Sequence, residues 1–219
     1  MTCLRCNLYS IIIVWTLLLC TALCACHTDP QSPRAAADTT ILPVPRQEGG
    51  GNTLSLLDKS PLDIVYYPPE YPKLKMIGKM PSPPVFRVIY SRPQKNGRKI
   101  FGSVVKYGEH WRLGANEATE IEFFEPVTIQ QTKVPAGRYM LYCIPQAAEW
   151  TLILNSGLYS WGLIIDAAKD VFKFTVPAIP ATTPIEAFTM ETLESKEGAL
   201  LWMGWDDTKV VLSIQLNNK

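Results

Sequence analysis

Residues 209–216, KVVLSIQL, place apolar side chains at alternate positions, with polar side chains between most of them. Such alternation is typical of a strand with one buried and one exposed face. The same pattern recurs in residues 119–123, TEIEF, and in residues 172–176, FKFTV. Residues 138–144 and 150–155 are apolar on both faces or nearly so, which predicts central strands. These segments predict a domain built from β-strands.

More strand candidates and several turn signals separate these segments. The further strand candidates are residues 85–90, 127–130, 185–193 and 199–203. Asn96-Gly97 and Val134-Pro135-Ala136-Gly137 have turn composition, and we expect Lys196-Glu197-Gly198 and Asp206-Asp207 to close two hairpins. The best helix candidate is one or two turns around residues 166–170. This spacing of eight to ten short strands predicts an all-β fold, a mostly antiparallel, jelly-roll-like β-sandwich in a single domain.

The N-terminus has the layout of a lipoprotein signal. Arg5 precedes an apolar run that begins at Ile11 and is too short to span a bilayer comfortably. The run closes with Leu23-Cys24-Ala25-Cys26, which resembles a lipobox whose last cysteine receives lipid. We expect residues 1–25 to be a signal peptide, with an uncleaved anchor helix as the alternative. His27 follows Cys26 in place of an aspartate that would mark inner-membrane retention, so we expect lipid anchoring to the outer membrane of the cell envelope.

A tether and then one compact body follow this signal. Residues 26–53 are rich in proline, alanine, threonine and glycine, a composition that predicts a flexible segment. Within it, Asp38-Thr39-Thr40 resembles a short O-glycosylation signal, so Thr39 is a candidate for glycosylation. Residues 61–84 are proline-rich and predict an irregular lead-in to the strands. We therefore place the β-sandwich domain at residues 54–219.

The composition excludes several classes of protein. The chain has 21 basic and 20 acidic residues, so it lacks the basic excess of a nucleic-acid binder. Its 47% hydrophobic content excludes a disordered chain. Cys143 is the single cysteine of the body, so the body cannot form an internal disulfide. It lies in an apolar strand candidate, and we expect it to be a buried core residue. The two histidines cannot build a zinc site of the usual kind, and we expect neither a metal nor a cofactor.

One polar stretch breaks the strand pattern and is the candidate functional site. Residues 107–120, YGEHWRLGANEATE, and residues 90–102, YSRPQKNGRKIFG, combine cations, acids, an amide and an aromatic ring. An arginine can pair with a carboxylate or phosphate, and a tryptophan can stack on a sugar. The alternative is a long connection whose polar groups satisfy buried backbone, with an internal Arg112–Glu117 ion pair. The candidate ligand-binding residues are Arg92, Arg98, Lys99, Trp111, Arg112, Asn116 and Glu117.

Several motifs of the body resemble a bacterial family known as domain of unknown function 2911. They are YSRP at 90–93, GRKIFG at 97–102, YG at 107–108, WRLGANEAT at 111–119, PAGRY at 135–139, WTLILN at 150–155 and Trp161-Gly162. The resemblance extends over about residues 54–216. It implies a secreted or lipid-anchored single domain and transfers no catalytic residue, because no activity is established for the family. His110 is not part of the family's hallmark motif.

The sequence therefore predicts an envelope lipoprotein with a non-catalytic role. We expect it to bind a small polar ligand or glycan, or to support an envelope assembly with a protein partner that the sequence does not identify. The alternative is an envelope hydrolase in which Glu117 or Glu109 acts as the base and Arg112 stabilises developing negative charge. A purely structural lipoprotein without a ligand site is the third possibility.

Overall fold

The computed structural model describes residues 59–80 and 82–216. The chain divides into two units, residues 1–51 and 52–219, and all the described residues belong to the second unit. The predictions on the signal peptide, the lipid on Cys26, the tether and Thr39 lie outside the described residues. In the described part of the chain, no helix is long and apolar enough to cross a membrane.

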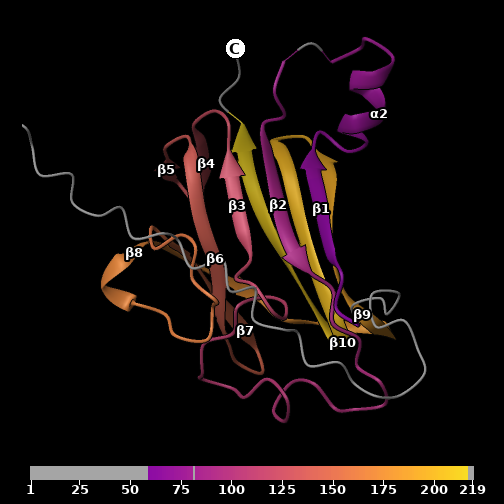
Figure 1. The fold of residues 1–219 in the computed structure, drawn as a ribbon, viewed down its shortest axis with the longest axis vertical. Coiled ribbons are helices and arrows are strands. Elements are labelled where there is room, and N and C mark those ends of the chain that lie inside the picture. Colours follow the sequence, from indigo (N-terminus) through magenta and orange to yellow (C-terminus); the bar gives the residue numbers. More distant parts are fainter. Residues whose placement is uncertain (1–58, 81, 217–219) are drawn as a thin grey trace, which may run out of the picture. The chain divides into compact units, whose positions relative to one another are not determined.

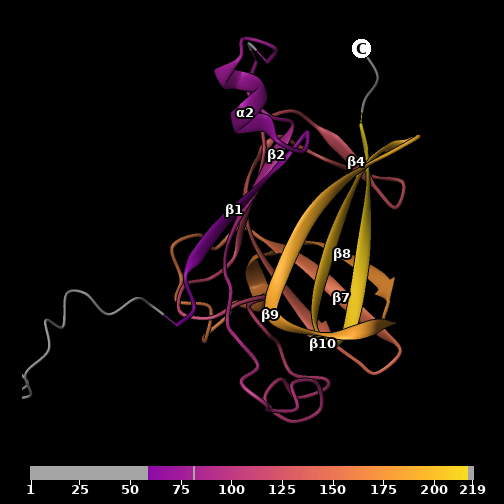
Figure 2. The same ribbon diagram turned by 90° about the vertical axis from the view of Figure 1, so that its right-hand side faces the viewer.

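Two antiparallel sheets face each other and confirm the predicted all-β sandwich (Figures 1 and 2). The six-stranded sheet has the order β1-β2-β3-β6-β7-β8, and the four-stranded sheet has the order β5-β4-β10-β9. The strands are β1 (Leu62–Tyr67), β2 (Phe86–Ser91), β3 (Glu120–Phe123), β4 (Val127–Ile129), β5 (Thr132–Val134), β6 (Gly137–Pro145), β7 (Glu149–Asn155), β8 (Asp170–Pro177), β9 (Ile179–Ser195) and β10 (Gly198–Leu216). Most strands pair with their neighbours in the chain, so the connections resemble a meander more than the paired Greek keys of a jelly roll.

The core lies between the two sheets and is filled by the alternating residues that the sequence predicts. Val210, Leu212 and Ile214 of β10 are at most 1% exposed, whereas Ser213 and Gln215 face solvent. Each such aliphatic side chain contributes roughly 1.5–3 kcal/mol by leaving water. The central strands β6 and β7 are buried on both faces, as expected.

The structure also confirms the prediction for Cys143 in β6. Its side chain is fully buried in the main core cluster, and burial raises the pKa of its thiol well above the ordinary value. A protonated thiol in apolar surroundings is a poor nucleophile. Cys143 is therefore a packing residue.

The prediction that Asp206-Asp207 closes a hairpin is wrong. These residues lie inside β10, which continues through them as a 19-residue strand paired with β9. The register shifts at Asp206, whose φ of 52° is left-handed, so the pair forms a bulge in the strand. The hairpin expected at residues 196–198 is confirmed, because Ser195 pairs with Gly198 across the β9–β10 turn.

The prediction of an irregular lead-in over residues 61–84 is also wrong. This segment contains the edge strand β1 and the short helix α2 (Tyr71–Met76), which lies at one end of the sandwich (Figure 1). Pro72 occupies the first turn of the helix, where a missing N–H costs no hydrogen bond. The expected helical turn near residues 166–170 is the 3-10 helix η2 (Ala167–Lys169). Asn96 and Gly97 both have positive φ, in agreement with the predicted turn.

Candidate functional site

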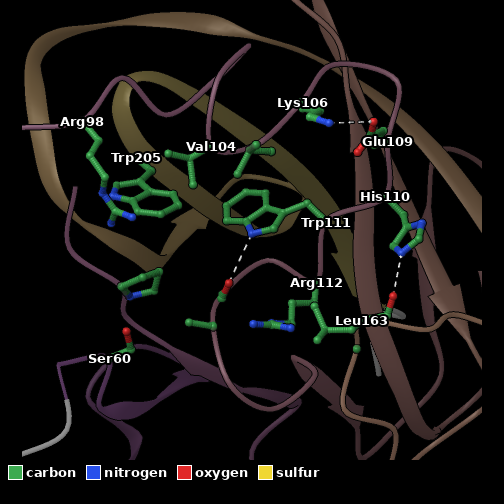
Figure 3. Close-up of a pocket in the computed structure, with 15 residues that line it drawn as sticks. Ser60, Arg98, Val104, Lys106, Glu109, His110, Trp111, Arg112, Leu163 and Trp205 are labelled. Atoms are coloured by element: carbon green, nitrogen blue, oxygen red, sulfur yellow. Dashed lines mark hydrogen bonds and ion pairs between the residues drawn. The ribbon is translucent and has the colours of Figure 1, made fainter. Parts of the chain in front are cut away.

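A cavity of about 390 Å³ is lined mainly by the connection between β2 and β3, and this connection lies at the end of the sandwich opposite α2 (Figure 1). The long connection between β2 and β3, residues 92–119, forms most of its wall. Ser60, just before β1, and the Gly162-Leu163 dipeptide contribute from other parts of the chain, and Trp205 contributes from β10 (Figure 3). The connection that interrupts the strand pattern in the sequence is thus the wall of a ligand-sized cavity.

Trp111 anchors this connection to the sandwich. Its backbone N–H donates to the carbonyl of Cys143 at 2.8 Å, and the N–H of Cys143 donates back at 2.9 Å. The indole packs edge-on against Trp150 and stacks on Trp205, with 5.7 Å between the Trp111 and Trp205 ring centroids. Its Nε1–H donates to the carbonyl of Gly114 at 3.2 Å. Trp111 is therefore largely a core residue that presents part of its ring to the cavity.

Arg112 carries the least satisfied polar groups of the cavity wall. Its Nε and Nη1 atoms are buried, and neither has a hydrogen-bond partner among the described residues. Burial lowers the pKa of the Arg112 guanidinium, and the charge of Glu117 offsets part of this effect. An arginine side chain remains protonated in proteins even so. The cavity wall thus holds a positive charge, two of whose nitrogen atoms donate no hydrogen bond to the described residues.

The expected Arg112–Glu117 ion pair is absent from the described part of the chain. Glu117 is exposed and lines a different, smaller cavity of about 280 Å³ together with Leu62 and Tyr159. Its charge acts on Arg112 only through space.

The rim of the cavity beside Arg112 carries further polar groups. Arg98 is exposed, and its guanidinium donates to the carbonyls of Lys95 and Gln94 at 2.8 and 2.6 Å. Lys106 lies 3.6 Å from a carboxylate oxygen of Glu109, and both side chains are about two-thirds exposed. His110 Nε2 lies 3.1 Å from the carbonyl oxygen of Leu163 (Figure 3). An exposed pair such as Lys106–Glu109 contributes little to stability.

Of the seven predicted ligand-binding residues, the structure brings Arg98, Trp111 and Arg112 to this cavity. Arg92 lies elsewhere and has a structural role, because it pairs with Asp63 at 3.2 Å and donates to Thr189 Oγ1 at 3.0 Å. The remaining predicted residues, Lys99, Asn116 and Glu117, are exposed and do not line the cavity.

The sequence did not point to the cavity residues that come from distant segments. Trp205 lies in β10, where the sequence alone does not distinguish an aromatic cavity residue from an aromatic core residue. Leu163 lies in a loop without polar motifs. The buried pair of Lys95 with Asp206 was also missed, although it fixes the start of the connection to β10. Within the described residues, no group of three or more histidine, cysteine, aspartate or glutamate side chains is arranged to hold a metal ion.

Fold and cavity together define an all-β sandwich domain with a small polar cavity walled by its longest connection. The chain belongs to the family described as Protein of unknown function (DUF2911), whose model matches residues 74–214. The motif resemblance noted in the sequence is thereby confirmed, and the family description names no activity. No curated protein and no solved structure matches the chain.

Proposed function

We propose that this chain is an envelope lipoprotein whose sandwich domain binds a small polar ligand through an anionic group, without chemical turnover. The observation that carries the proposal is that Arg112 lines the cavity and that its buried Nε and Nη1 atoms have no hydrogen-bond partner among the described residues. The lipobox-like segment ending at Cys26 supports the lipid attachment.

An anionic ligand would relieve a specific energetic cost. A buried polar group without a partner costs about 1–3 kcal/mol, and more when it is charged. A carboxylate or phosphate oxygen accepts hydrogen bonds from a guanidinium in a planar geometry, often with two bonds at once. The partly buried ring of Trp111 offers an apolar surface in the same cavity, as an acidic sugar would need.

The surroundings of the acidic residues favour binding over hydrolysis. Glu109 pairs with Lys106 on the rim, and Glu117 lines the smaller cavity. His110 faces a backbone carbonyl of the Leu163 loop, and no carboxylate orients its ring among the described contacts. A general base needs a positioned side chain within hydrogen-bonding distance of the reacting proton, and these contacts provide none beside Arg112.

Calorimetric titration of the purified full-length chain tests the ligand site. The probes are glucuronate, citrate, inorganic phosphate and soluble peptidoglycan fragments. Binding of one probe is expected to fall at least tenfold in Arg112→Gln and to remain unchanged in Arg138→Gln. Arg138 is a suitable control because it is half-buried and already paired with Glu120 at 3.6 Å. Equal losses in both variants, or a probe consumed during the titration, would contradict the proposal.

Mass spectrometry of the chain extracted from membranes tests the lipid attachment separately. The expected species begins at Cys26 and carries acyl chains. A chain that retains residues 1–25 without acylation would refute the lipoprotein assignment and leave the ligand site untouched.

A further inference from the structure

The loop of residues 156–165, SGLYSWGLII, exposes four large apolar side chains. Tyr159, Trp161, Leu163 and Ile164 are 85%, 64%, 62% and 89% exposed, respectively. The ten residues of the loop carry no charge. Surface hydrophobic residues that occur singly are normal, but four of them in six consecutive residues form the kind of cluster that marks an interaction surface.

Internal hydrogen bonds hold the loop in this exposed arrangement. The N–H of Gly157 donates to Asn155 Oδ1 at 2.7 Å, and the N–H of Gly162 donates to Ser160 Oγ at 3.1 Å. At the far end of the loop, Asn155 Nδ2 donates to the carbonyl of Asp166 at 2.9 Å. The exposure of the apolar side chains is thus a property of an ordered loop.

The loop has apolar neighbours and charged neighbours of both signs, because Glu117 and Glu120 line the smaller cavity together with Tyr159. Leu163 borders the main cavity together with Val104, which is itself half exposed. Arg98 and Lys106 lie on the same cavity and are exposed, and Glu109 is the one acid among the described residues that line it. The exposed apolar side chains of the loop match the interfacial region of a bilayer, where tryptophan and tyrosine rings are enriched.

The path of the chain points to the same occupant. Ser60, at the start of the described body, lines the same cavity as Leu163, so the first 58 residues are attached beside this loop. Those residues include the apolar run that begins at Ile11 and the candidate lipid site Cys26. If these residues attach the body to a membrane, the exposed loop lies on the side of the body from which they leave.

We propose that the loop of residues 156–165 docks onto the surface of a lipid bilayer. Trp161 and Tyr159 have the amphipathic rings that favour the membrane interface, while Leu163 and Ile164 enter the hydrocarbon boundary. The inference concerns a surface other than the ligand cavity and goes beyond the proposed ligand binding. It relies on the proposed lipoprotein only for the route to the membrane, and acylation of Cys26 is measured separately.

Fluorescence quenching of the full-length chain in vesicles tests this docking. The vesicles contain phosphatidylethanolamine and phosphatidylglycerol, with a fraction of lipids brominated near the middle of the acyl chain. Trp15→Phe serves as the background, because Trp15 lies in the apolar N-terminal run. The signal of Trp161 is obtained by subtracting the spectrum of the same chain with Trp161→Phe. The control is Met76→Trp in that doubly substituted chain, because Met76 is 78% exposed on α2 at the other end of the sandwich (Figure 1).

The brominated lipids are expected to remove more than half of the Trp161 signal and to leave the Met76→Trp signal unchanged. Equal quenching at both positions would overturn the proposal, because the body would then have no preferred face. Absence of quenching would also overturn it. If acrylamide failed to reach Trp161 while brominated lipids left it unquenched, the occupant of the loop would be a protein or a second copy of the chain.

Discussion

A Cβ atom added to Gly162 would lie 2.9 Å from both the Cβ and the Cδ of Arg112. The loop that contains Gly162 therefore passes directly against the aliphatic stem of Arg112 and fixes the position of the guanidinium. Gly162 also has a φ of 77°, which side chains other than glycine rarely adopt. A glycine is needed at this position for two reasons, one conformational and one steric.

Comparison of Gly162→Ala with a control variant separates the conformational effect from the steric effect. Gly78→Ala is a matched control, because Gly78 has a φ of 71° but no atom within 4 Å of the added Cβ. Each variant should lose about 1 kcal/mol from the left-handed backbone. Gly162→Ala should lose about 1–3 kcal/mol more from overpacking against Arg112. Urea unfolding monitored by tryptophan fluorescence measures the difference, and equal losses would show that the Arg112 stem moves aside freely.

Arg112→Met should stabilise the ligand-free protein. Methionine keeps the aliphatic stem that packs against Gly162 and removes a buried guanidinium with two unpartnered N–H groups. The expected gain is about 1–2 kcal/mol, since a buried polar group without a partner costs about that much. Thermal unfolding in the absence of any probe measures it. A loss of stability would show that ordered water already satisfies Nε and Nη1, and the case for a ligand there would weaken.

The buried pair of Asp206 with Lys95 should make the stability depend on pH. The Asp206 carboxylate also accepts the N–H of Ile100 at 3.0 Å, so it ties the β2–β3 connection to the bulge of β10. Burial alone would raise the pKa of Asp206. Hydrogen bonds from Lys95 and Ile100, together with the charges of Lys95 and Lys99, bring this pKa below the ordinary 3.8.

Because the folded pKa of Asp206 is lowered, folding favours its charged form. Its contribution to stability is therefore complete above its unfolded pKa of 3.8 and is lost as the pH falls through the folded value. Asp206→Asn should cost about 1–3 kcal/mol at neutral pH, because it removes the charge that faces the half-buried Lys95. The deficit should shrink as both proteins are unfolded with urea at progressively lower pH below 4. A deficit that stays constant with pH would show that the charge of Asp206 is not what stabilises the bulge.

Asp206 also illustrates why part of the fold could not be predicted from the sequence. Two adjacent aspartates between apolar runs are typical of a turn, and the local pattern holds no sign of Lys95, which lies 111 residues earlier. The long-range pair stabilises the left-handed backbone within a strand. Strands such as β6 and β7 were predictable because the apolar pattern within each strand is enough to indicate that it is buried. The strand β1 was missed because proline follows it and its exposed face is apolar.

The candidate site was predictable to a similar extent. The polar connection of residues 107–120 stood out in composition and does form the cavity wall at Trp111 and Arg112. No pattern in the sequence indicated that Arg92 would form an ion pair with Asp63, or that Leu163 and Trp205 would complete the cavity. Those contacts join segments that only the packing of the two sheets brings together.

Tyr90 provides a last test, because its hydroxyl joins the two sheets. The N–H of Met190 in β9 donates to Tyr90 Oη at 2.9 Å, and both residues are buried. Burial is the main reason that the pKa of Tyr90 is raised to about 12, and the charge of Asp63 also raises it. Tyr90→Phe should cost about 1–3 kcal/mol, since it leaves a buried backbone N–H without a partner.

Urea unfolding of Tyr90→Phe measures this loss, and Tyr159→Phe is the matched control because Tyr159 is 85% exposed. The control should leave the unfolding free energy unchanged, because an exposed hydroxyl exchanges protein contacts for water at little cost. A spectrophotometric titration gives a second readout, in which Tyr90→Phe removes a phenol that ionises near pH 12. If the two variants were equally stable, a water molecule would have to satisfy the Met190 amide in Tyr90→Phe, and the Tyr90 hydroxyl would contribute nothing to the contact between the sheets.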